Sequence, residues 1–190
     1  MLFAILTFMI YNFSCSTNHD YFPNKRNVLT SDFNQYDNFF PIATLDLLSK
    51  GIKDKIHVMY VSFDPSIDHK KPFPGNDYID VFSFKISDEG KLLPTFDKSA
   101  LAISKDFKEY FVKDQEKYSK TKQENRASSL IDLTDEPEWW QDDAAPVNSK
   151  GKPMRFICQV DMNEFSNDDC RLFIFYDEVD RVIKYIYQRD

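Results

Sequence analysis

Three apolar runs that follow one another near the C-terminus place the strongest constraint on the fold of this chain. They are Met154–Asp161, Cys170–Asp177 and Arg181–Tyr187. Each run is short and rich in β-branched and aromatic residues, and turn-forming polar residues separate it from the next, which is typical of β-strands. Because short connections join antiparallel neighbours, we predict that this part of the chain is an antiparallel meander.

Two further runs upstream have the same character. Ile56–Phe63 carries apolar side chains on both faces, which predicts a strand in the centre of a sheet. Tyr78–Ile86 predicts another strand, and Asp88–Lys91 predicts a hairpin turn after it. Aromatic residues make up 16% of the chain, so we expect a core built largely of rings.

Helical spacing occurs in two segments. In Ile42–Lys53, leucine and isoleucine recur at intervals of three and four residues. Ser104–Glu124 is the stronger candidate, because Ser104 can cap it and aromatic residues form an apolar stripe. Its highly charged second half predicts a helix end that projects into solvent or frays. We therefore expect an α+β fold, a mostly antiparallel sheet with two or so packing helices, in a single domain over residues 39–190.

The N-terminal residues predict export. Residues 1–14 carry no charge and form an apolar run shorter than the roughly 20 residues that span a membrane, as in a signal peptide. Ser14–Cys15 and the polar residues that follow resemble a bacterial lipoprotein signal, although no basic residue precedes the run. Residues 1–15 are thus a predicted signal with Cys15 as the lipidation site, and residues 16–38 a polar tether. The predicted location is the cell envelope (periplasmic or outer face), with a lipid anchor as the only membrane contact. The alternative is a cytoplasmic protein with a buried N-terminal strand or helix.

Charge and motif content argue against several functional classes. The net charge of −7 disfavours nucleic acid as a partner, because phosphate binding needs a basic face, and it favours a basic protein partner. The three histidines, His19, His57 and His69, are far apart and have no metal-binding spacing. No nucleophile motif or phosphate-binding loop is present. We therefore predict no metal, no cofactor and no catalytic residue.

The cysteines after residue 15 do not form a metal-binding or redox motif. Cys158 and Cys170 lie in strand-like, apolar contexts, where a free cysteine behaves as a small buried hydrophobic residue. We expect two separate buried thiols, although an oxidising compartment would allow a disulfide between them.

The segment Pro137–Asp143 combines both tryptophans of the chain with acidic residues. Consecutive side chains of an extended backbone point to opposite sides, so one indole can enter the core while the other stays near the surface. An exposed indole beside carboxylates is typical of residues that anchor a protein interface. The predicted partner-binding residues are Trp139, Trp140, Gln141, Asp142 and Asp143. The alternative is that both rings only close over the sheet.

Gln159 and Asp161 lie two residues apart on a predicted strand and therefore share a face. If they are buried, both side chains need hydrogen-bond partners, for which the backbone of the tryptophan segment is a candidate. We interpret them as a structural polar pair rather than as catalytic groups.

The stretch from Glu136 to Asp190 resembles the C-terminal part of the YwqG-like family of bacterial proteins. The positions that carry the resemblance are Pro137, Trp139, Gln141, Asp143, Pro146, Gly151, Lys152, Pro153, Met154, Phe156, Gln159 and Asp161. Where many relatives carry a cysteine pair suggestive of zinc, this chain has Val147–Lys150. The resemblance implies an α+β fold and, because some relatives are associated with toxin gene clusters, a role as an immunity protein. It implies no known reaction.

These observations together predict an exported, membrane-tethered, non-catalytic domain that binds a basic partner protein, of which a toxin to be neutralised is one example. Two alternatives stay open. One is a hydrolase-like enzyme whose site is assembled from dispersed acids and His57 or His69, which a pocket bringing two such groups together would favour. The other is a structural lipoprotein without catalytic activity.

Overall fold

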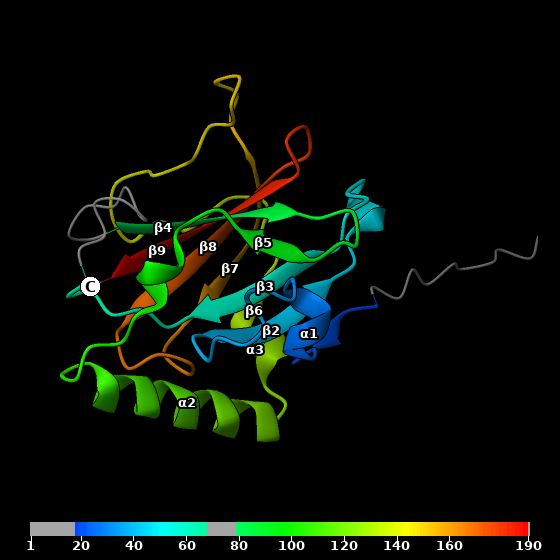
Figure 1. The fold of residues 1–190 in the computed structure, drawn as a ribbon. Helices are drawn as coiled ribbons and strands as arrows, with labels where there is room; N and C mark the ends of the chain where they lie inside the picture. Colours follow the sequence, from blue (N-terminus) through cyan, green and yellow to red (C-terminus); the bar gives the residue numbers. More distant parts are fainter. Residues whose placement is uncertain (1–17, 68–78, 190) are drawn as a thin grey trace, which may run out of the picture.

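The computed structural model describes residues 18–67 and 79–189, which form two antiparallel sheets (Figure 1). The smaller sheet has the order β1-β2-β3, with β1 Asp20–Tyr21, β2 Phe39–Leu45 and β3 Ile56–Val61. The larger sheet has the order β5-β4-β9-β8-β7-β6, with β4 Ile79–Ile86, β5 Leu92–Pro94, β6 Ile131–Asp132, β7 Arg155–Asp161, β8 Cys170–Asp177 and β9 Val182–Arg189. The helical segments of the described residues are α1 Lys25–Val28, η1 Leu48–Lys50, η2 Lys98–Leu101, α2 Lys108–Gln123 and α3 Ala127–Leu130. The predicted α+β fold and the C-terminal meander β7-β8-β9 are confirmed.

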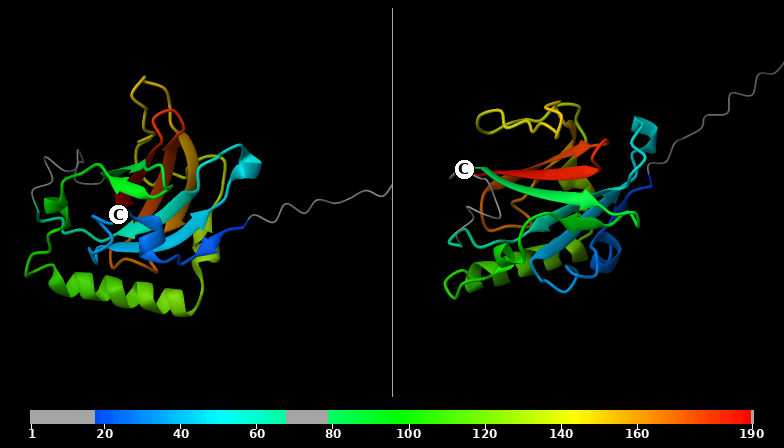
Figure 2. Two further views of the ribbon diagram at one scale, coloured as in Figure 1. Left: turned by 45° about the vertical axis from the view of Figure 1, so that its right-hand side comes forward. Right: turned by 45° about the horizontal axis from the view of Figure 1, so that its top comes forward.

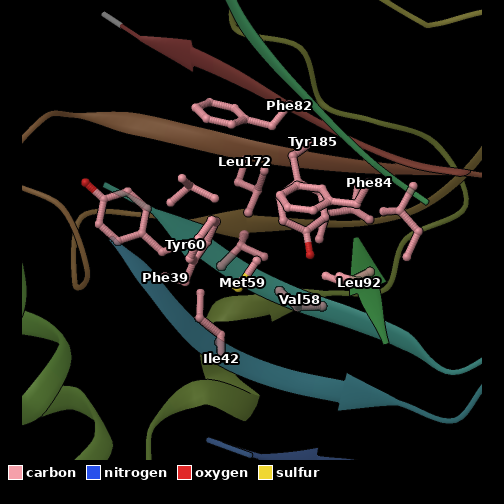
Figure 3. Close-up of a cluster of buried hydrophobic side chains, with 14 of the residues drawn as sticks. Phe39, Ile42, Val58, Met59, Tyr60, Phe82, Phe84, Leu92, Leu172 and Tyr185 are labelled. Atoms are coloured by element: carbon pink, nitrogen blue, oxygen red, sulfur yellow. The ribbon is translucent and has the colours of Figure 1, made fainter. Parts of the chain in front are cut away.

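The small sheet lies against one face of the large sheet, and the main hydrophobic core fills the space between them (Figure 2). Alternate residues of β8 and β9, such as Leu172 and Tyr185, point into this core and are completely buried. Figure 3 shows them opposite Phe39, Ile42 and Val58 of the small sheet. The period-two alternation of these strands therefore divides the large sheet into an inner, core-facing side and an outer side.

Strand β3 is an edge strand, so the prediction that it sits centrally is wrong. Its edge is nevertheless covered, because two tyrosines of β9 bond its backbone. The Tyr185 hydroxyl donates to the His57 carbonyl at 2.6 Å, and the Val61 N–H donates to the Tyr187 hydroxyl at 3.1 Å. All six residues of β3 are buried although only one strand pairs with it, because β9 of the large sheet packs against it and Tyr60 bonds Asp114 of α2.

The helix predicted over Ile42–Lys53 is also wrong. Its first residues belong to β2, which pairs with β3 from Phe39↔Val61 to Leu45↔Ile56, and only η1 is helical. All seven residues of β2 are buried, so tertiary pairing outweighs a helical spacing that rested on a few leucines and isoleucines. The predicted strands at Ile56 and Tyr78 and the hairpin turn at Asp88 are confirmed as β3, β4 and the β4–β5 connection.

Helix α2 confirms the helix predicted over Ser104–Glu124, but it begins at Lys108 and Ser104 is not its cap. Ser104 accepts a hydrogen bond from the Phe107 N–H at 3.2 Å in the turn before the helix. It runs along the lower side of the molecule in Figure 1. The expectation that its second half projects or frays is wrong, because that half is tied down. The Tyr118 hydroxyl donates to the Pro41 carbonyl at 2.7 Å, and Thr121 is buried and donates to the Glu164 carbonyl at 2.9 Å.

A buried carboxylate, Asp114, fastens the middle of α2. Its Oδ2 accepts from the hydroxyls of Tyr60 at 2.7 Å and Ser62 at 2.6 Å, and its Oδ1 accepts from the Asn167 N–H at 3.0 Å. Burial raises the pKa of Asp114, while these donors oppose that shift by favouring the charged form. The network joins α2, β3 and the β7–β8 connection, so it has a structural role.

Residues 16–38 were expected to be a polar tether, but residues 18–38, which the structure describes, are part of the fold. β1 pairs with β2, and Val28, Leu29 and Phe33 are buried in the main core. The boundary predicted at residue 39 is therefore corrected, since the packed part already includes Asp20. The predicted signal, residues 1–15 with Cys15, lies outside the described residues. Within the residues that are described, no helix has the length and apolar character needed to cross a membrane.

Candidate functional site

The outer side of the large sheet is covered by the segment between β6 and β7 (residues 133–154). It closes over a small apolar cluster of Met154, Phe173, Phe175 and Ile186. Trp139 packs onto this cluster, with its ring centroid 4.5 Å from that of Phe173 and stacked at 5.8 Å on that of Phe175. Trp139 is therefore a packing residue that fixes the segment on the sheet.

Gln188 of β9 holds the backbone of the tryptophan segment. Its side chain is completely buried, and its Oε1 accepts from the N–H groups of Trp140 at 2.9 Å and Gln141 at 3.3 Å. Its Nε2 donates to the Asp142 carbonyl at 3.1 Å. A single amide thus satisfies three backbone groups, which fixes the path of residues 140–142 across the sheet.

Gln159 of β7 makes a similar attachment one step earlier in the segment. It is buried, its Oε1 accepts from the Glu138 N–H at 2.9 Å, and its Nε2 donates to the Asp132 carboxylate at 3.2 Å. Asp161 is exposed, and its carboxylate accepts from the Asn163 N–H at 3.0 Å. The two residues of the expected polar pair therefore have different surroundings, and only Gln159 bonds the tryptophan segment.

Trp140 is the exposed indole of the pair, with 37% of its surface accessible. The guanidinium of Arg171, from β8, lies over its ring with Cζ at 4.8 Å from the centroid. Arg171 Nη1 also donates to the Glu138 carbonyl at 3.1 Å and to the Glu138 carboxylate at 3.3 Å. Gln188 thus holds the backbone of Trp140, and the Arg171 guanidinium lies over its ring.

The remaining predicted contact residues lie beside Trp140. Asp142 and Asp143 are exposed, and the Asp143 carboxylate accepts from the Ala145 N–H at 2.8 Å in a local turn. Gln141 turns inward and its Nε2 donates to the Arg189 carbonyl. Trp139 and Gln141 therefore hold the segment in place, whereas Trp140, Asp142 and Asp143 are available at the surface.

Sequence reasoning missed Arg171, Glu138 and Gln188 as parts of this site. A sequence signal exists for one of them, because Arg171 is a charged residue inside the apolar run of β8; Gln188 is its direct partner in the β8–β9 register. What they bond could not be read from the sequence, because the tryptophan segment lies far away along the chain.

The groups proposed for an enzymatic alternative do not converge in the described residues. His57 is buried, its Nε2–H donates to the Gly90 carbonyl at 2.8 Å, and its Nδ1 accepts from the Thr44 hydroxyl at 2.9 Å. Both ring nitrogens are engaged, and burial lowers the pKa of His57. His19 bonds the Asp46 N–H, and His69 lies outside the described residues.

Neither the surface groove described next nor the arrangement of possible metal ligands supports the enzymatic alternative. A groove of about 480 Å³ between α1, β2 and α2 is lined by Lys25, Tyr118 and Lys122 among others, and none of its lining residues is a histidine. Among residues 18–67 and 79–189, no three His, Cys, Asp or Glu side chains come together as metal ligands. Cys158 and Cys170 are separate, buried free thiols as predicted, and burial raises the pKa of both.

Comparison with known proteins finds no family model, no curated protein sequence and no solved structure that matches this chain. The resemblance to the YwqG-like family stays a prediction.

Proposed function

We propose that this protein is a non-catalytic protein-binding domain that captures a basic partner through Trp140 and the acids around it. The contact surface, which we call the tryptophan face, consists of Glu138, Trp140, Asp142 and Asp143. The observation that carries the proposal is that the indole of Trp140 is exposed while the buried side-chain amide of Gln188 holds its backbone in place.

Pre-organisation is the physical reason why this arrangement suits binding. An exposed tryptophan on a mobile loop loses conformational freedom when a partner orders it, and that loss weakens the complex. Here Gln188 and Gln159 fix the backbone of the tryptophan segment before any partner arrives. A large, rigid aromatic side chain of this kind is typical of interface hot spots.

Charge defines the class of partner. The tryptophan face carries three exposed acids, Glu138, Asp142 and Asp143, on a chain with a net charge of −7. Complementary charge accelerates association with a basic protein and disfavours acidic ones. In keeping with the sequence, we extend the proposal to an envelope protein anchored through Cys15, with a toxin that it neutralises as one form of the basic partner.

The proposal is tested by capture with the immobilised domain from a lysate of the native host. A basic protein retained by the unaltered chain should be lost with Trp140→Ala, and Asp142→Asn with Asp143→Asn should reduce both its association rate and the salt dependence of that rate. Tyr110→Ala is the matched control, because Tyr110 is an exposed aromatic residue on α2 and is not one of the residues of this face. Equal capture by Trp140→Ala and the unaltered chain would remove the tryptophan face from the proposal.

A further inference from the structure

We propose that Arg171 occupies an arginine site on the tryptophan face, and that an arginine of the partner replaces it when the partner binds. This inference rests on the proposed function, because it names the side chain by which the partner is recognised.

The site consists of groups that attract a cation. They are the face of the Trp140 indole, the Glu138 carbonyl and the Glu138 carboxylate, and Arg171 contacts all three at 4.8, 3.1 and 3.3 Å. A guanidinium is planar and carries several N–H donors, so it can stack on the ring and bond two oxygens at once. A lysine ammonium is a point charge without a stacking plane and fits this set less well. The site therefore selects arginine.

Arg171 is a replaceable occupant. Its pair with Glu138 is partly exposed, with 21% of the Arg171 side chain and 66% of the Glu138 side chain accessible, and ion pairs that reach solvent contribute little to stability. A partner arginine that enters the site makes the same contacts that Arg171 gives up. The exchange also adds the partner's remaining contacts with the exposed acids Asp142 and Asp143.

An alternative position for the displaced Arg171 lies next to it. Asp161 of β7 is directly opposite Arg171 in the β7–β8 register, so their side chains share the outer side of the sheet. Asp161 is exposed and its carboxylate accepts one hydrogen bond, from the Asn163 N–H. On the other side Arg171 faces Gln188, whose amide is already engaged. Movement of Arg171 from Glu138 to Asp161 thus keeps its charge paired during the exchange.

The test uses a short oligoarginine peptide and tryptophan emission. In a Trp139→Phe background only Trp140 emits, while an aromatic ring is kept on Phe173 and Phe175. Removing the resident guanidinium with Arg171→Ala should tighten peptide binding about tenfold, since the peptide no longer competes with one exposed ion pair and one cation–π contact. An oligolysine peptide of equal length should bind less tightly to Arg171→Ala than the oligoarginine peptide does.

A second substitution separates replacement from simple positioning of the ring. Asp161→Asn removes the alternative partner, so it should weaken peptide binding to the chain that contains Arg171 and have little effect in the Arg171→Ala background. Weaker or equal binding by both Arg171→Ala and Arg171→Gln, with unchanged circular dichroism, would overturn the inference. So would equal affinity for the two peptides. Either result leaves the proposed function standing as long as Trp140→Ala still abolishes partner capture.

Discussion

The attachment of the tryptophan segment by Gln188 leads to a quantitative prediction. Gln188→Leu keeps a buried side chain of similar size but removes the three hydrogen bonds to Trp140 N, Gln141 N and the Asp142 carbonyl. At about 0.5 to 1.5 kcal/mol net for each bond, the attachment loses about 1.5 to 4.5 kcal/mol. The free-energy loss lies in the lower part of this range if residues 140–142 detach from the sheet, because their backbone groups then form hydrogen bonds with water.

The assay compares two optical signals during urea denaturation. Both tryptophans of the chain lie in this segment, so tryptophan emission reports its detachment, whereas circular dichroism reports the sheets. In the unaltered chain we expect the two transitions to coincide. In Gln188→Leu the emission transition should come at a lower urea concentration than the circular dichroism transition, because the segment detaches before the sheets unfold.

The matched control is Gln123→Leu, which replaces an exposed glutamine at the end of α2. A surface substitution of this kind should change the unfolding free energy by no more than about 0.5 kcal/mol. Coincident transitions in Gln188→Leu, with a midpoint like that of the control, would refute the reasoning that this amide holds the segment in place.

Three further predictions concern the buried polar groups. Asp114→Ala should lower the unfolding free energy by about 3 kcal/mol or more in urea titration, since it leaves buried hydroxyls without their acceptor; a loss below about 1 kcal/mol would contradict this. Burial lowers the pKa of His57 from 6.5, so the folded state favours the neutral imidazole. The stability that this provides is complete above pH 6.5 and is lost as the pH falls through the pKa of the folded state. The urea midpoint should thus fall more steeply below pH 6.5 in the unaltered chain than in His57→Gln, and equal slopes would count against the assignment. In a Cys15→Ser background, Cys158 and Cys170 should react with a thiol reagent only after unfolding, because burial keeps them protonated and raises the pKa of Cys170 to about 12; modification of the folded chain would disprove that.

Strands that form an uninterrupted apolar run between polar residues could be predicted from the sequence, even where both faces are buried. The bounds of β8 were predicted correctly because polar residues end an apolar run at Cys170 and Asp177. β2 was missed because Pro41 interrupts its apolar run and because Leu45, Leu48 and Ile52 have a helical spacing. Its role depends on pairing with β3, which local spacing does not encode.

The site could be predicted in part. Two adjacent tryptophans in an extended backbone left two arrangements open, and the structure has the one in which Trp139 packs and Trp140 stays near the surface. The support from Gln188 and Arg171 could not be foreseen, since each bond joins residues that only the folded sheet brings together. Asp114 was missed for a related reason: a carboxylate in a charged helix suggests exposure unless its partners are known.

The tyrosine hydroxyls along β3 have a consequence for self-association. An open strand edge is a template on which a second chain can add, which is one route to aggregation. In this protein Tyr185 and Tyr187 occupy backbone groups of that edge and leave less of it for a neighbour. Their replacement by phenylalanine would keep the rings but leave those buried groups without partners, which favours opening of this edge. The double variant should therefore form β-rich aggregates at concentrations where the unaltered protein stays monodisperse.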